Sequence, residues 1–412
     1  MKRHKKKIIT ILLSLVIGAV VGITAGFYGE ALHSAEHIRE SLYIYTVPFM
    51  GVVGVFILFL YKHTSPASEQ GLNLAIAYTE GQVDTSGHIM DKSHAYKIGK
   101  YPRAYAVLKL FTNITMLFFG ASTGKEGSFA AFGASIGDYV ARIFRRRRLS
   151  RTLLLCGVGA AVSGLFQTPL GGVFFALEFA ASGVMPYSML LPLTVASFTA
   201  VFFSKLCGFT AFSYSVVCDM AVTPKNMALI AVCAVIYGLF GRLFAVTINK
   251  AHHIYHERVK NRYLCMFIVG TLMAAVLILT HGGRYCGTGA AMVSELFSGG
   301  EFMMYDFALK FVFTIICITI GFSGGEMMPL LAIGAALGAA LGSVLGLPIP
   351  LCGAIGAVSV YSAATNTLLA AMFIGFEMFG TDAALYIAIS CIIAYAVNGN
   401  SSVYTLQKHS RL

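Results

Sequence analysis

The sequence has 412 residues, of which 57% are hydrophobic and 12% are charged, and its mean hydropathy is +0.76. This composition excludes a soluble domain of this length and predicts an all-α polytopic membrane protein. The net charge of +12 comes from basic residues beside apolar spans. It therefore indicates membrane topology and not a nucleic-acid-binding surface.

The chain begins with a basic segment, residues 1–7, followed by an apolar run over residues 8–27. The run is too long for a signal-peptide core and lacks a small-x-small cleavage site, so it is interpreted as a first membrane helix with a cytoplasmic N-terminus. Further spans are expected at 46–60, 104–119, 152–179, 190–203, 227–248, 266–280, 307–320 and, as a dense series, 329–397. Several are shorter than the ~20 residues of a full crossing, which indicates tilted, re-entrant and half-crossing helices.

A glycine-rich stretch, residues 120–140, places Lys125 and Glu126 between glycines at membrane depth. Charge is costly there, so an intramembrane carboxylate indicates a functional site. The glycines predict a break in the backbone and a new helix near Ser128. The N-terminus of such a helix presents free N–H groups and the positive end of its dipole, which together favour an anion.

The same pattern recurs later in the chain. Residues 321–338 match residues 120–137 at a constant offset of 201, with identities that include Gly120/Gly321, Ser122/Ser323, Gly124/Gly325, Gly133/Gly334 and Gly137/Gly338. Pro329 falls opposite Ser128 and suits the first turn of a second helix. We therefore expect two related halves, about 45–205 and 225–405. Paired broken helices predict a transport site at the repeat interface.

Other clusters have simpler interpretations. The arginines at 142, 145–148 and 151 indicate a cytoplasmic loop and not a lipid or nucleic-acid site. His252, His253 and His256 have helical spacing, but no cysteine or carboxylate pair supports a metal site beside them. The nine cysteines are scattered and are expected to be apolar fillers, outside any disulfide. No cofactor and no metal are expected.

One enzymatic alternative rests on Gly321-Phe-Ser323-Gly324, which matches the Gly-x-Ser-Gly turn of intramembrane serine proteases. Such a protease needs a histidine base inside a neighbouring membrane helix. The eleven histidines lie at span edges or in loops, and the nearest candidate is His281. This alternative stays remote, and we expect no enzymatic activity.

Several segments resemble the CLC chloride channel and transporter family. Gly124-Lys-Glu-Gly127 looks like the Gly-Arg/Lys-Glu-Gly motif of that family. The segments 71–76, 169–178, 324–329 and 399–404 resemble, in the right order, its first motif, the segment after the first anion site, its second motif and its last helix. The resemblance covers about residues 45–405.

The resemblance implies two inverted repeats with broken and re-entrant helices in one transmembrane domain, residues 1–412, with no C-terminal regulatory domain. It also implies a homodimer in the cell membrane, with a separate pathway in each subunit. Glu126 would be the gating glutamate, and helix starts at Leu72, Ser128 and Met328 would aim N–H groups at the anion. The anion-binding residues implied are Leu72, Asn73, Lys125, Gly127, Ser128, Phe129, Met327, Met328 and Tyr404.

Three departures from the family pattern point to one branch. Leu72 replaces the serine of the chloride branch, and Phe179 stands where chloride/proton exchangers keep an inner glutamate. Glu326 lies inside the second motif instead, in a Gly-Gly-Glu pattern that resembles the fluoride/proton antiporter branch. That branch usually has methionine at Leu72 and threonine at Met328. Glu326 is therefore predicted to handle protons together with Glu126, and Glu178 and Glu377 are structural or lesser proton-path candidates.

The preferred function is halide transport coupled to protons, with fluoride export favoured. Two carboxylates beside one anion site could pass a proton while the anion moves. Chloride/proton exchange and a passive voltage-gated-type chloride channel stay open as alternatives. The expected partners are a halide, protons, the lipid bilayer and a second copy of the chain.

Overall fold

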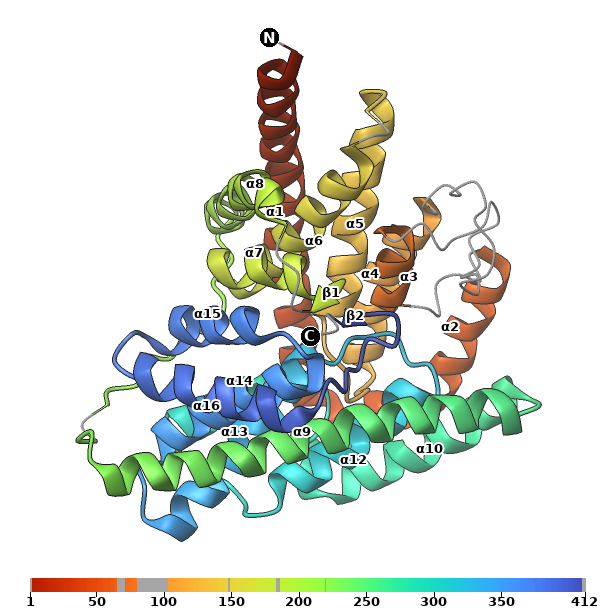
Figure 1. The fold of residues 1–412 in the computed structure, drawn as a ribbon. Coiled ribbons are helices and arrows are strands. Elements are labelled where there is room, and N and C mark those ends of the chain that lie inside the picture. The colour runs from red at the N-terminus through yellow and green to blue at the C-terminus, as the bar shows by residue number, and fades with distance from the viewer. Residues whose placement is uncertain are drawn as a thin grey trace.

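The computed structural model describes residues 2–64, 71–79, 103–146, 149–182, 186–218 and 220–409, and this part of the chain is almost entirely helical (Figure 1). Its helices are α1 (Lys2–Thr46), η1 (Val47–Phe49), α2 (Met50–Thr64), α3 (Gly71–Thr79), α4 (Arg103–Phe118), α5 (Glu126–Ile143), α6 (Ser150–Phe166), α7 (Pro169–Glu178), α8 (Tyr187–Leu206), α9 (Pro224–Arg258), α10 (Arg262–Leu279), η4 (His281–Gly283), α11 (Ala290–Phe297), α12 (Asp306–Thr319), α13 (Met327–Leu345), α14 (Ile349–Thr365), α15 (Leu368–Phe379) and α16 (Ala384–Asn398). Two-residue strands, β1 (Ala181–Ser182) and β2 (Lys408–His409), pair in parallel.

The predicted all-α membrane architecture is confirmed. Five helical stretches of the described residues are long and apolar enough to cross a membrane, namely Lys7–Thr64, Tyr187–Leu206, Pro224–Arg258, Arg262–Leu279 and Met327–Leu345. Shorter apolar helices fill the space between them, as the irregular spans predicted. Such half-crossing elements are stable only when other protein segments surround them.

The first helix is longer than the apolar run at residues 8–27. α1 continues to Thr46, with a kink at Leu42 where φ is −117° and ψ is 19°. The part beyond residue 27 is mostly exposed, but a few of its polar side chains bond to distant segments of the protein. Arg39 is only 4% exposed, and its guanidinium donates to the backbone oxygen of Leu117 at 3.3 Å.

The span expected at 152–179 is two helices. Gln167 takes a left-handed conformation with φ 55°, which ends α6, and Pro169 opens α7. The second half repeats this break: Asn366, also with φ 55°, ends α14 just before α15. The dense series at 329–397 likewise resolves into α13, α14, α15 and α16. Hydropathy alone missed these breaks because the residues on both sides are apolar.

The two repeats meet at their glycines. The first glycine loop, residues 119–125, joins α4 to α5, and the second glycine loop, residues 320–326, joins α12 to α13. Gly124 N donates to Gly325 O at 2.6 Å and Gly325 N donates to Gly124 O at 2.9 Å, as an isolated antiparallel bridge. These two residues are equivalent at the offset of 201. Antiparallel pairing of equivalent residues is what a two-fold axis between the repeats produces, so the inverted-repeat prediction is confirmed.

Within each half, glycines let two helices approach at backbone distance. α5 packs on α6 where Gly133 meets Gly157, and a Cβ built on Gly157 would lie 1.9 Å from the backbone oxygen of Gly133. α13 packs on α14 in the same way, where Gly334 meets Gly356. Small residues at such contacts are typical of helices associating in lipid.

Gly157→Ala is therefore expected to destabilise the protein by about 1–3 kcal/mol, because the added methyl group forces α5 and α6 apart. The measurement is thermal unfolding of the purified protein in detergent. Gly353→Ala in α14 is the matched control, since its nearest neighbour is the movable end of Leu296 at 3.0 Å. Equal losses in the two variants would show that the close approach is not the cause.

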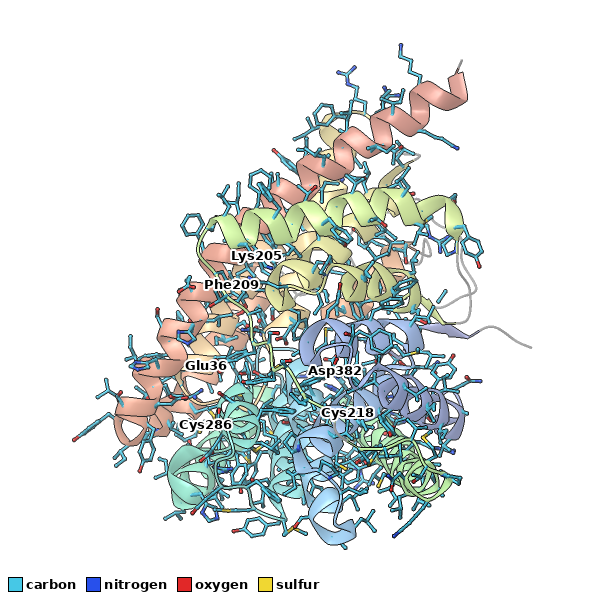
Figure 2. The ribbon with its side chains drawn as sticks, turned by 90° about the vertical axis from the view of Figure 1, so that its left-hand side faces the viewer. Glu36, Lys205, Phe209, Cys218, Cys286 and Asp382 are labelled. Atoms are coloured by element: carbon cyan, nitrogen blue, oxygen red, sulfur yellow. The ribbon has the colours of Figure 1, made fainter. Side chains whose placement is uncertain are left out.

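A linker over residues 207–223 joins the halves. Figure 2 follows it from Lys205 at the end of α8, past Phe209, to Cys218 beside the second-half helices. Its backbone pairs with the end of α15: Tyr214 N donates to Met378 O at 2.8 Å and Val216 N donates to Phe379 O at 3.0 Å. The linker is thus attached to the second half before α9 begins.

Candidate anion pathway at the repeat interface

Three helices begin at the centre of the molecule, close to the positions predicted. α5 begins at Glu126 and α13 at Met327, each within two residues of the expected starts at Ser128 and Met328. α3 begins at Gly71, beside Leu72. The first N–H groups of each helix have no intrahelical partner, so the three N-termini provide donors for an anion.

A cavity of about 530 Å³ reaches these helix starts. Its walls bring together six of the predicted site residues, Leu72, Asn73, Gly127, Ser128, Glu326 and Tyr404. They come from α3, α5, the second glycine loop and the C-terminal segment, which are far apart in the sequence. The other predicted residues, Lys125, Glu126, Phe129, Met327 and Met328, are buried and do not line the cavity.

The carboxylate of Glu126 bridges the starts of α5 and α13. It is 1% exposed, and its Oε2 accepts from Lys125 N at 3.1 Å and from Met328 N at 3.3 Å. One carboxylate oxygen thus occupies N–H donors at the starts of both α5 and α13. An anion at this point would need the same donors, so the carboxylate and the anion compete for them.

At the starts of α3 and α5, three polar side-chain atoms are buried without a hydrogen-bond partner among the described residues. They are Glu126 Oε1, Asn73 Oδ1 and Ser128 Oγ. An unsatisfied buried polar group costs about 1–3 kcal/mol, so three of them in one place need an explanation. A polar ligand or a transferable proton at this point would satisfy them.

Tyr404 is held by aromatic side chains of α7. Its ring lies edge-on to Phe175 at 6.3 Å and to Phe179 at 6.4 Å between centroids, and it is 3% exposed. The backbone nitrogen of Tyr404 donates to Ser402 Oγ, and the pairing of β1 with β2 ties the following residues to the end of α7. Phe175 and Phe179 therefore support the tyrosine, which lies beside Glu326.

The side chain of Lys125 points away from the cavity toward the linker. Its Nζ lies 5.7 Å from the ring centre of Phe209 and 5.6 Å from that of Phe212. The ring of Phe129 stacks on the ring of Tyr28, with 5.0 Å between their centroids. Met328 contributes its backbone N–H to Glu126, whereas its side chain supplies no hydroxyl to the site.

Sequence reasoning missed the basic residues that line the rest of the cavity. Lys109 of α4 is 6% exposed and lies over the ring of Tyr61, 4.9 Å from its centroid. His252, His256 and Arg262 also line the cavity, and Arg262 Nη2 donates to His256 Nδ1 at 2.8 Å. Lys109 had a signal in the sequence, because a lysine inside an apolar run is itself an intramembrane charge.

The residues behind the protease and metal-site alternatives have defined surroundings in the structure. The hydroxyl of Ser323, the candidate protease nucleophile, accepts from Thr112 Oγ1 at 2.9 Å, and no hydrogen bond joins it to a described histidine. The histidines of α9 belong to no group of three metal-ligand side chains within the described residues.

Glu178 and Glu377 cap each other's helices. The carboxylate of Glu178, at the end of α7, accepts from Leu369 N at 3.1 Å and Ala370 N at 2.9 Å at the start of α15. Glu377 near the end of α15 accepts from Leu170 N at 3.0 Å and Gly171 N at 2.9 Å at the start of α7. The pair satisfies orphan helix donors across the repeats, which is a structural role.

Comparison with known proteins agrees with this architecture. The model of the voltage gated chloride channel family matches residues 75–399. A chloride/fluoride channel protein of Pseudomonas syringae pv. tomato is 29% identical over 409 residues, which cover 97% of this chain and 86% of that protein.

Two solved structures share the fold. A crystal structure of a CLC-type fluoride/proton antiporter has a TM-score of 0.91 and 32% identity, covering 97% of this chain and 98% of the other. A slow cyanobacterial Cl⁻/H⁺ antiporter has a TM-score of 0.81 at 18% identity, covering 96% of each chain, and shows the fold alone. The central glycine loops, the three helix starts and these matches place the chain in the CLC family of voltage-gated chloride channels and their transporter relatives.

Proposed function

We propose that this protein is a proton-coupled halide antiporter that exports fluoride, with Glu126 and Glu326 as its proton-handling groups. The observation that carries this proposal is the position of Glu326. It lines the cavity beside Tyr404, whereas the family resemblance puts Phe179, which packs against Tyr404, where chloride exchangers have their inner acid. An acid on the cavity wall can take up a proton from water and stay within reach of the anion.

The anion would bind between helix N-termini. We expect its donors to be backbone N–H groups at the starts of α3, α5 and α13, together with the hydroxyl groups of Ser128 and Tyr404, two residues that line the cavity. Leu72 and Met328 add no hydroxyl, so the ligands at those positions are backbone N–H groups. Fluoride is small and strongly hydrated, and a set of close backbone donors can replace its water shell.

The transport step follows from the hydrogen bonds of Glu126. In its ionised form the carboxylate holds Lys125 N and Met328 N, the donors that an anion requires. Protonation removes the charge that favours those bonds, and the side chain then releases them to the anion. Glu326 would exchange protons with the cavity, so that anion and proton pass the same point in alternation.

The similar proteins support the proposal that the transported halide is fluoride and that its transport is coupled to protons. The CLC-type fluoride/proton antiporter matches almost the whole of this chain at 32% identity. The chloride/fluoride channel protein of Pseudomonas syringae is nearly as similar. Chloride exchange and passive conduction are therefore the outcomes against which fluoride antiport is tested.

We also propose that the protein is a homodimer in the cell membrane with its N-terminus in the cytoplasm. The start of α1 and the end of α5 lie at the same end of the molecule (Figure 1), and both carry basic residues, among them Lys7 and Arg142. This is the distribution of a cytoplasmic face. α8 exposes Leu191, Phe202 and Leu206, which need lipid or a second copy to cover them.

The test is flux from liposomes that contain the purified protein. Fluoride or chloride efflux and proton influx are recorded from the same sample, without and with an imposed pH gradient. We expect fluoride efflux to drive proton uptake, and a pH gradient to drive fluoride against its own gradient. Anion efflux with no proton response would replace the antiporter with a channel, and chloride moving as well as fluoride would remove the fluoride preference.

A further inference from the structure

One buried amide of α4 contacts both glycine loops. Asn113 is 0% exposed, and its Nδ2 donates to Gly124 O at 3.1 Å and to Ser323 O at 3.0 Å. Its Oδ1 accepts from the hydroxyl of Tyr28 at 2.5 Å. Both N–H groups and the oxygen of the amide are therefore engaged, so the side chain has one orientation.

The two carbonyl groups belong to different halves of the protein. Gly124 lies two residues before Glu126, and Ser323 lies three residues before Glu326. The first glycine loop and the second glycine loop each lead directly into one of the two acids. Asn113 is thus a single side chain that fixes the backbone in front of both proton-handling groups.

Asn113 is also connected to the helix that carries Glu126 through Tyr28 and Phe129. The hydroxyl of Tyr28 holds Asn113, and the ring of Tyr28 stacks on Phe129 at 5.0 Å with an interplanar angle of 13°. Phe129 lies in the first turn of α5, three residues after Glu126. Tyr28 is itself only 4% exposed, so the network of Tyr28, Asn113 and the loops is enclosed in the protein.

The other half has no equivalent of this amide. The residue at the offset of 201 from Asn113 is Thr314, and its hydroxyl makes one hydrogen bond of 3.2 Å with Ser122 Oγ. The remaining bonds between the loops are the Gly124–Gly325 pair and the contact of Thr123 Oγ1 with Ser323 O. Repeat symmetry therefore does not account for Asn113, which suits a task performed once at the shared centre.

We propose that Asn113 is a positioning residue that keeps anion and proton movement coupled by holding the two glycine loops in register. This inference rests on the proposed antiport function. Glycine backbone is conformationally permissive, so loops held only by their own bonds can shift when the Glu126 side chain leaves its donors. If the loops shift, an anion can pass before the proton exchange is complete, and transport slips.

The experiment compares the number of protons moved per anion in liposomes containing wild type, Asn113→Ala, Asn113→Asp or Tyr28→Phe. Aspartate keeps the size of the side chain but removes the two amide N–H groups that donate to the loops, and phenylalanine keeps the stack on Phe129 but removes the hydroxyl. We expect the ratio to fall at least about fivefold in the two Asn113 variants and less in Tyr28→Phe, with anion flux continuing. A residue that served folding alone would lower the yield and leave the ratio unchanged.

Thr115→Ala is the matched control, because Thr115 is half-buried on the same helix and its hydroxyl bonds to Phe111 O of that helix and not to a glycine loop. Its ratio should equal that of the wild type. Unchanged ratios in folded Asn113 variants overturn the proposal, and if neither folds, an unchanged ratio in Tyr28→Phe does so. If the wild-type protein shows no proton response, the antiport function itself is refuted. If the wild-type protein and the Asn113 variants are equally coupled, only the role of Asn113 is refuted.

Discussion

Glu326→Gln is expected to stop proton movement and to slow anion exchange at least about tenfold, which corresponds to ~1.4 kcal/mol in the barrier. Glu326 is the predicted acid that lines the cavity, and the family resemblance puts Phe179 where chloride exchangers have their inner acid. Glutamine has nearly the same shape but cannot carry a proton, so the anion loses its exchange partner. In a passive channel, the same change would alter conductance modestly and leave anion flux running.

The measurement for Glu326→Gln is paired anion and proton flux in liposomes under an imposed pH gradient. Glu257→Gln is the control, because Glu257 is an exposed side chain that pairs with His253 at the end of α9. It should transport as the wild type does. Proton-driven transport that persists at the wild-type rate in Glu326→Gln would remove this residue from the proton path.

Glu126→Gln is expected to abolish proton coupling while the protein keeps its fold. The glutamine oxygen can still accept from Lys125 N and Met328 N, so the local geometry should survive. The side chain can no longer alternate between a charged form that competes with the anion and a neutral form that releases its donors. The number of protons moved per anion should fall at least about tenfold.

Two readouts separate a gate from a structural residue at position 126. Thermal unfolding and elution volume should match the wild type, which shows that folding and assembly are intact. Anion efflux should then become insensitive to a pH gradient. The gating assignment is wrong if a well-folded Glu126→Gln protein still pumps fluoride with the wild-type response to pH.

Much of the fold follows from local features of the sequence. Apolar composition indicates the membrane, and glycines around Lys125 and Glu326 break the helices where the structure breaks them. The starts of α5 and α13 were predicted to within two residues because glycine and proline act on their immediate neighbours. The repeat at the offset of 201 predicted two related halves, and the family resemblance implied that they are inverted. The Gly124–Gly325 bridge joins two of the equivalent residues.

Other features were out of reach of local patterns. The length of α1 depends on partners that Arg39 finds about 80 residues away, and the break at Gln167 lies inside a uniformly apolar run. Lys109 and His252 line the cavity because of the way that α4 and α9 pack. No spacing rule in a single sequence predicts that these residues line the same cavity as α3.

The sequence by itself determined the class of protein, the repeat and the two acids of the centre. Only the tertiary structure decided that Glu326 faces the cavity while Glu126 lies buried on the N-termini of two helices. It also decided that Phe179 supports Tyr404 and that Asn113 bonds to both loops. Several of these contacts join segments more than 200 residues apart. Which side chains meet there depends on how the two halves pack, which local propensity and hydropathy do not encode.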